Sequence, residues 1–263
     1  MVKNRSFVTL MLTLVALAVV ATGCGGGGAG GGGEQKAETA APEPAPAAQP
    51  AGPTGTVTGT VSYTNGDPDT QIKMDADPVC ASLHPEAIET ETVIAEGGKL
   101  ANAFVYVKSG LTGSFSPPDS AQTLDQKGCR YFPHVSGIQV GQKLVIKNSD
   151  PTLHNVHALP KNNQEFNQGQ PFQNMELEKT FDTAEVMVRF KCDVHPWMGA
   201  YMGVLDHPFF AVSAVDGSFT IDGLPPGEYA LEAWHETLGS RSATVTVASD
   251  TVSAASFEFA PAG

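Results

Sequence analysis

Four side chains able to bind a soft metal ion lie in two short segments of the sequence. Cys192, His195 and Met198 supply a thiol, an imidazole and a thioether at spacings of three residues. His154 lies upstream, just after the turn-forming stretch Asn148–Pro151. Two imidazoles and one thiolate, with a weak axial methionine, form the ligand set of a mononuclear blue-copper centre. The pattern therefore predicts one copper ion held by these four residues.

Several alternatives stay open at this site. Met202 could replace Met198 as the axial ligand, and His157 could replace His154, because each lies close to the preferred residue in sequence. Zinc also accepts two imidazoles and one thiolate. A catalytic thiol with His154 as its base would leave the second imidazole and the thioether without a role. We therefore expect no enzymatic activity.

The other acids and histidines form no second constellation in the sequence. Acidic residues in the loops are expected to be solvated rather than catalytic, namely Asp150, Asp182 and Asp193. The remaining histidines are expected to have structural roles, namely His84, His134, His207 and His235.

The N-terminal stretch predicts export. Two basic residues precede the apolar stretch 7–21, as in a secretory signal peptide over residues 1–23. The small residues before Cys24 resemble a bacterial lipobox, in which the cysteine is lipidated and becomes the new N-terminus. Residues 24–54 are rich in Gly, Ala and Pro and are expected to form a tether. We expect a lipid anchor to a membrane facing the periplasm or the cell exterior, with the outer membrane favoured.

Three cysteines remain after the lipidation site, an odd number for an exported protein. Because Cys192 is assigned to the metal, Cys80 and Cys129 are expected to form a disulfide in an oxidising compartment. The alternative is a second metal site, in which Cys80 acts with His84 and Cys129 acts with His134.

Beyond the tether, the sequence predicts an all-β protein. Short apolar runs alternate with Gly, Pro and Asp turns, as in antiparallel sandwiches. Only one helix-start signal occurs, with Asp77 as N-cap and Pro78 in the first turn. The expected strands are Thr56–Tyr63, Ala103–Lys108, Lys143–Lys147, Val186–Lys191, Ser218–Ile221, Glu228–Ala233 and Ala243–Val247.

The chain is strongly acidic, with a formal net charge of -13 over 263 residues. Such a surface repels phosphate backbones, which excludes nucleic-acid binding, and it favours a basic-faced protein partner. No apolar run reaches the about 20 residues that a membrane-spanning helix needs. We therefore do not expect an integral membrane protein.

The segments around the predicted ligands, Gln139–Leu159 (QVGQKLVIKNSDPTLHNVHAL) and Phe190–Leu205 (FKCDVHPWMGAYMGVL), resemble the cupredoxins, in particular amicyanin-like members. The resemblance covers about residues 122–207 and implies a Greek-key sandwich that carries single electrons at the copper site predicted above. It implies that Asn155 ties the two ligand loops together by hydrogen bonds. It also implies that His195 is partly exposed through an apolar patch, and that the partner is a redox protein such as a cytochrome.

A second segment, Asp216–Trp234 (DGSFTIDGLPPGEYALEAW), resembles the carboxypeptidase-regulatory or transthyretin-like sandwiches. It holds too few strands for a sandwich of its own, and Thr56–Tyr63 and Ala103–Lys108 resemble the opening strands of the same fold. We therefore expect a transthyretin-like sandwich split between residues 55–121 and 208–263, with the cupredoxin-like domain inserted between them. The alternative is a single enlarged cupredoxin.

Three functions compete at this stage. The first is a membrane-tethered electron carrier. The second is copper buffering, sensing or delivery without redox turnover, which differs from the first in releasing its metal readily. The third is an adhesive or glycan-binding module with ancillary copper, for which the sequence offers no ring of aromatic residues.

Overall fold

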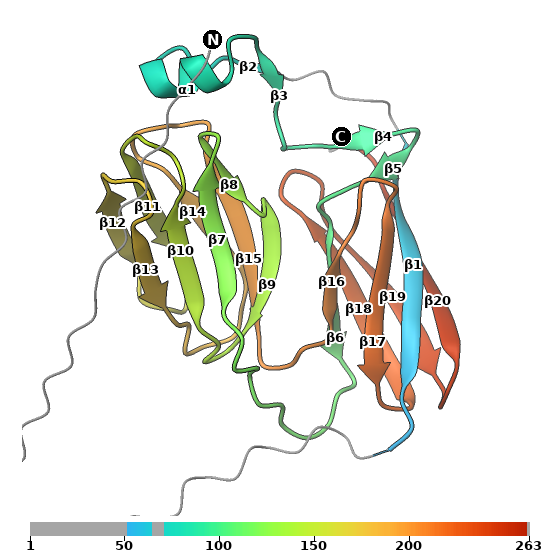
Figure 1. Cartoon of the computed structure of the whole chain (residues 1–263). Coiled ribbons are helices and arrows are strands. Elements are labelled where there is room, and N and C mark those ends of the chain that lie inside the picture. Colours follow the sequence, from blue (N-terminus) through green and yellow to red (C-terminus); the bar gives the residue numbers. More distant parts are fainter. Residues whose placement is uncertain (1–51, 65–70, 262–263) are drawn as a thin grey trace, which may run out of the picture. The chain divides into compact units, whose positions relative to one another are not determined.

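The computed structural model describes residues 52–64 and 71–261 (Figure 1). These residues form mainly strands, with one short helix, α1 (Pro78–Leu83), so the all-β prediction is confirmed. None of them belongs to a helix with the length and hydropathy of a membrane span. The predicted signal peptide, the predicted lipidation site Cys24 and all but the last three residues of the predicted tether lie outside the described residues.

The first sandwich is built from strands near both ends of the described chain. Its strands are β1 (Gly55–Tyr63), β4 (Ala95–Glu96), β5 (Lys99–Leu100), β6 (Phe104–Ser109), β16 (Phe210–Val212), β17 (Ser218–Leu224), β18 (Gly227–His235), β19 (Gly239–Val247) and β20 (Val252–Phe259). One sheet has the order β17-β1-β5-β4, and β20 also pairs with β1. The other sheet has the order β16-β6-β18-β19.

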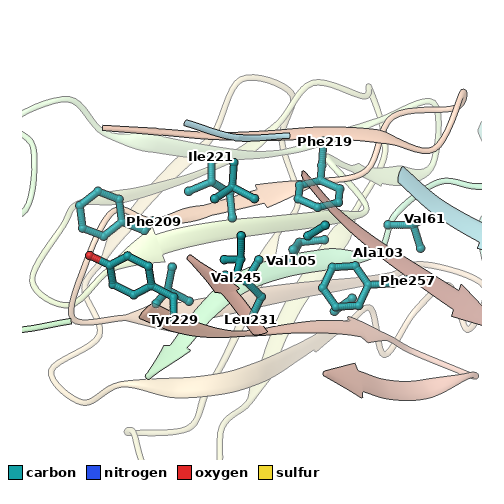
Figure 2. Packing of buried hydrophobic residues seen from close by; sticks show 14 of the residues in the cluster. Val61, Ala103, Val105, Phe209, Phe219, Ile221, Tyr229, Leu231, Val245 and Phe257 are labelled. Carbon is teal, nitrogen blue, oxygen red and sulfur yellow. The ribbon is translucent and has the colours of Figure 1, made fainter. Parts of the chain in front are cut away.

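Alternating side chains of these strands fill the first core. In β1, Val57, Val61 and Tyr63 are buried while Thr60 between them is exposed. Successive side chains of a strand point to opposite faces of the sheet, so an alternating sequence gives each strand one apolar face. Figure 2 shows the apolar faces of the strands meeting around Val105.

The second sandwich is formed by the chain between β6 and β16. Its strands are β7 (Gln122–Lys127), β8 (Arg130–Phe132), β9 (Val135–Gln139), β10 (Leu144–Asn148), β11 (His154–Leu159), β12 (Phe166–Gln170), β13 (Glu176–Lys179), β14 (Glu185–Lys191) and β15 (Gly199–Leu205). The two sheets have the orders β13-β10-β7-β8 and β12-β11-β14-β15-β9. Its core runs from Leu124 to Val204 and contains Cys192 and Met198.

The helix α1 lies in the segment between β2 (Gln71–Ile72) and β3 (Ile88–Glu89). Its N-cap is Asp77, whose Oδ1 accepts hydrogen bonds from the backbone N–H groups of Val79 and Cys80 at 2.8 and 3.0 Å. The predicted N-cap is therefore confirmed. These bonds satisfy two of the donors that a helix N-terminus leaves unpaired.

A small apolar cluster joins strands of the two sandwiches, with Phe104 and Leu205 among its buried members. Gly203 of β15 faces the Phe104 ring so closely that a Cβ atom there would lie 2.4 Å from a ring carbon. A side chain at this position would force the ring or the strand to move. Glycine is therefore required here by the close approach of β6.

We expect Gly203→Ala to lower the free energy of unfolding by about 1–3 kcal/mol, because overpacking a filled core costs this much. The matched control is Gly169→Ala in β12, where a Cβ atom would meet no atom within 4 Å. Urea denaturation of both variants measures the difference. Equal stabilities would contradict the close packing of β15 against Phe104.

His235, at the end of β18, is 1% exposed, and burial lowers the pKa of its imidazole from 6.5 to about 4. The unfolded chain takes up a proton near pH 6.5, whereas the folded chain resists it until about pH 4. The stability from this group is therefore present at neutral pH and is lost as the pH falls between these two values. At about 1.4 kcal/mol per pKa unit, the loss approaches roughly 3 kcal/mol.

The variant His235→Asn tests this linkage. Its free energy of unfolding, measured by urea denaturation from pH 7 to pH 4, should decrease less steeply than that of the wild-type chain. Parallel curves for the two chains would show that His235 titrates alike in the folded and unfolded states.

Candidate metal centre

Three of the four predicted ligands lie together in the second sandwich. His154 is the first residue of β11, and Cys192 and His195 lie in the loop between β14 and β15. Nδ1 of His154 lies 3.0 Å from Nδ1 of His195, which in turn lies 3.7 Å from Sγ of Cys192. All three side chains are buried, and their donor atoms lie within 4.8 Å of one another.

The loop that carries Cys192 and His195 is closed by its own backbone. The N–H of Cys192 donates to the carbonyl of Met198 at 3.3 Å, and the N–H of Met198 donates to the carbonyl of His195 at 3.0 Å. Met198 is 2% exposed and belongs to the same core as Cys192. Met202, the alternative axial ligand, is also buried but lies within β15, opposite Val188 of β14.

Asn155 connects the two ligand-bearing segments. Its Oδ1 accepts a hydrogen bond of 3.0 Å from the backbone N–H of Asp193, which directly follows Cys192. The hydroxyl of Tyr131 in β8 donates to the Asn155 carbonyl at 2.6 Å. The strand that starts at His154 is thus linked both to the cysteine loop and to the opposite sheet.

The electrostatics of the site favour the thiolate form of Cys192. Burial raises the pKa of this thiol, but hydrogen bonds from His154 and His195 and from the backbone N–H groups of His195 and Asn155 lower it to about 6. Burial also opposes the charged form of His154, yet its pKa is raised because Asp150 and Cys192 stabilise the imidazolium. The metal-free site therefore favours a Cys192 thiolate beside a protonated His154 imidazole, and a metal ion would have to displace the imidazole proton.

Asp150 was expected to be a solvated loop residue, and that expectation is wrong. It is 4% exposed, and its Oδ2 lies 2.9 Å from Nε2 of His154. The same carboxylate accepts hydrogen bonds from the backbone N–H groups of Gly128 and Cys129 at 2.8 and 2.7 Å. The signal for this contact in the sequence is the spacing of four residues between Asp150 and His154. A turn between them brings the carboxylate back against the imidazole. Asp182 and Asp193 are exposed, as expected.

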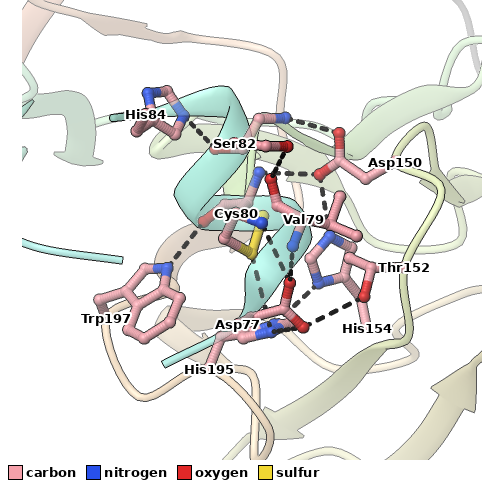
Figure 3. Close-up of a disulfide and its surroundings, with 12 residues drawn as sticks. Asp77, Val79, Cys80, Ser82, His84, Asp150, Thr152, His154, His195 and Trp197 are labelled. Atoms are coloured by element: carbon pink, nitrogen blue, oxygen red, sulfur yellow. Dashed lines mark hydrogen bonds and ion pairs between the residues drawn. A yellow bond between two sulfur atoms is a disulfide. The ribbon is translucent and has the colours of Figure 1, made fainter. Parts of the chain in front are cut away.

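His195 was expected to be partly exposed, and that expectation is also wrong, because the residue is only 2% exposed. Helix α1 covers its outer edge (Figure 3). Oδ2 of Asp77 lies 3.4 Å from Nε2 of His195, and Sγ of Cys80 lies 3.8 Å from the same atom. Sequence reasoning identified Asp77 only as a helix cap, since nothing local relates it to a histidine more than a hundred residues later.

Cys80 and Cys129 form a disulfide in the structure. The histidines that the alternative second metal site required have other partners. Nε2 of His84 lies 2.8 Å from the carbonyl of Gly128, and His134 forms an ion pair with Glu236. The disulfide between Cys80 and Cys129 therefore crosslinks α1 to the turn between β7 and β8.

The remaining histidines lie outside the ligand cluster of the described residues. His157, the alternative ligand, contacts Asp193 and Glu165 at 3.0 and 2.8 Å instead. Nε2 of His207 lies 2.9 Å from the carbonyl of Val107 in the first sandwich.

The lowered pKa of Cys192 gives a direct test on the metal-free chain. Its ultraviolet thiolate absorbance should rise with a midpoint near pH 6, and His154→Gln should move this midpoint upward, because one stabilising hydrogen bond is lost. Cys192→Ser is the control that identifies the signal, because Cys80 and Cys129 are in a disulfide and any signal from a free Cys24 would remain in this variant. If the midpoint is the same in His154→Gln and in the wild-type chain, the hydrogen bond from His154 to the Cys192 thiolate is contradicted.

Comparison with known proteins finds no matching family model and no matching curated protein. Among solved structures, an oxidised mutant of amicyanin is 24% identical and covers 33% of this chain and 84% of its own, with a TM-score of 0.29. A purple cupredoxin from Nitrosopumilus maritimus is 21% identical and covers 33% of this chain and 99% of its own, with a TM-score of 0.28. A copper-containing nitrite reductase from Thermus scotoductus SA-01 is 15% identical. The match covers 56% of this chain and 28% of the reductase, with a TM-score of 0.32.

Proposed function

We propose that this chain is an electron carrier that holds one copper ion between His154, Cys192, His195 and Met198. The observation that carries the proposal is the buried cluster of two imidazole nitrogens and one thiol sulfur within 4.8 Å of one another. A bound copper ion in such a set takes up and releases single electrons. The protein residues supply the donors, exclude water and keep the donors in place.

The donor set fits copper better than a structural zinc site. Zinc in structural sites is held by four nitrogen or thiolate ligands, whereas the residue that completes this loop is the thioether of Met198. Soft thiolate and thioether donors select copper, and imidazole suits it as well. The thiol of Cys192, with its pKa lowered to about 6, reaches the required thiolate form near neutral pH.

The surroundings of the donors favour a carrier over an enzyme. His154, Cys192, His195 and Met198 are each at most 2% exposed, so no donor position is open to a substrate. The donors sit on β11 and on a loop between two paired strands, whose ladders resist displacement. A site that changes little between oxidation states suits electron transfer rather than turnover of a bound substrate.

Copper buffering, sensing or delivery is the alternative function. A donor of copper must open its site to a recipient, and here a crosslinked helix covers His195. This enclosure supports slow release of the metal and thus the carrier.

The partner and the location are proposals that rest on the sequence. The formal charge of -13 supports a basic-faced redox protein such as a cytochrome as partner. The lipobox-like residues before Cys24 support a lipid anchor to a membrane facing the periplasm or the cell exterior.

Addition of Cu(II) to the full chain tests the proposed centre. We expect an intense visible thiolate-to-copper band in the wild-type chain and its loss in Cys192→Ser, because the thiolate is one partner of the transition. Met198→Gln should retain copper and shift the Cu(II)/Cu(I) potential. The control Met202→Leu keeps that buried position apolar and should leave the potential unchanged. A colourless chain, or one that binds zinc in preference to copper, would overturn the proposal.

A further inference from the structure

The outer edge of His195 is covered by a segment from a distant part of the chain. Nε2 of this imidazole points away from the ligand cluster and lies 3.4 Å from Oδ2 of Asp77, in the N-cap of α1 (Figure 3). Sγ of Cys80 lies 3.8 Å from the same nitrogen. A carboxylate is the strongest acceptor that the chain offers to a ring N–H group.

Several independent contacts hold Asp77 in this position. Its Oδ1 caps α1, and the hydroxyl of Thr152 donates to its Oδ2 at 3.2 Å. The disulfide between Cys80 and Cys129 crosslinks the helix to the second sandwich. The indole N–H of Trp197, in the ligand loop, donates to the Cys129 carbonyl at 3.1 Å. The carboxylate is thus fixed with respect to the loop that carries His195.

The arrangement repeats on the other imidazole. Nε2 of His154 lies 2.9 Å from Oδ2 of Asp150, and the Nδ1 atoms of His154 and His195 face each other at 3.0 Å. A neutral imidazole carries its proton on one nitrogen and a lone pair on the other. Two Nδ1 lone pairs cannot face each other at 3.0 Å, so one of these atoms carries a proton in the metal-free chain. A carboxylate beside Nε2 of His195 favours the neutral tautomer with its proton on Nε2, whose Nδ1 lone pair is directed at the ligand cluster.

We propose that Asp77 is a positioning residue for His195. The Asp77 carboxylate faces the Nε2–H group of the ring, which keeps its proton, and thereby directs Nδ1 toward Cys192 and His154. Helix α1, crosslinked by its disulfide, covers the outer edge of the His195 ring, while the Asp77 side chain stays 21% exposed. The role of Asp77 in metal binding rests on the proposed copper site. The tautomer of His195, however, can be measured in the metal-free chain.

The first test is NMR of the ¹⁵N-labelled, metal-free full chain, in which ring nitrogen signals report the histidine tautomer. We expect the neutral imidazole of His195 in the wild-type chain to carry its proton on Nε2, and the Asp77→Ser chain to show a mixture of the two neutral tautomers. Serine retains the helix cap, so α1 keeps its N-terminal hydrogen bond. The matched control is Asp75→Ser, an exposed position in the same segment, which should behave as the wild-type chain.

The second test is copper binding by the same variants, with Thr152→Val added because it loosens the carboxylate without touching the helix cap. Loss of a partner that orients a metal-binding histidine weakens the affinity about 10- to 100-fold, so Asp77→Ser should weaken copper binding by this factor and Thr152→Val by less. The Cu(II)/Cu(I) potential of Asp77→Ser should rise, because a nearby negative charge favours the more highly charged ion.

The outcomes separate the two proposals. If Asp77→Ser matches Asp75→Ser in both the His195 tautomer and the copper affinity, the role of Asp77 is overturned. If the wild-type chain binds no copper, the proposed function is overturned, whereas the tautomer in the metal-free chain still decides for or against Asp77.

Discussion

The second sandwich buries two imidazole nitrogens and one thiol sulfur within 4.8 Å of one another. Burial of polar groups is unfavourable unless each finds a partner. Here each imidazole has a carboxylate at its outer nitrogen, and the thiol accepts hydrogen bonds from backbone N–H groups. The hydrogen bonds of Asp77, Asp150 and Asn155 can therefore be understood as the compensation that makes this cluster tolerable in a core.

The same requirement explains why the segment around α1 belongs to the centre. Without it, the edge of His195 would meet water, as the likeness to cupredoxin motifs implied. With it, the imidazole is enclosed and is only 2% exposed. Trp197 of the loop that carries Cys192 and His195 is half-buried, and its ring centroid lies 5.1 Å from that of His195.

Many local features could be predicted from the sequence. Alternation of β-branched and small residues predicted β1, and short apolar runs predicted β6, β10 and β14, each to within one residue at both ends. These patterns are local properties of the chain. The sequence did not predict β12 and β13, because these edge strands are polar and have little apolar alternation. The types and order of His154, Cys192, His195 and Met198 also indicated a soft-metal site, because the ligand chemistry resides in the side chains themselves.

Which groups surround those ligands was decided only by the tertiary structure. Asp150 lies close to His154 in sequence, yet its burial depends on the turn between β7 and β8, which supplies two N–H donors. Asp77 reaches His195 only because the disulfide and the path of the chain bring α1 over the ligand loop. Spacing along a sequence determines contacts within a strand or a turn. Contacts between segments a hundred residues apart depend on how the sheets pack, and here that packing determines the exposure and the orientation of His195.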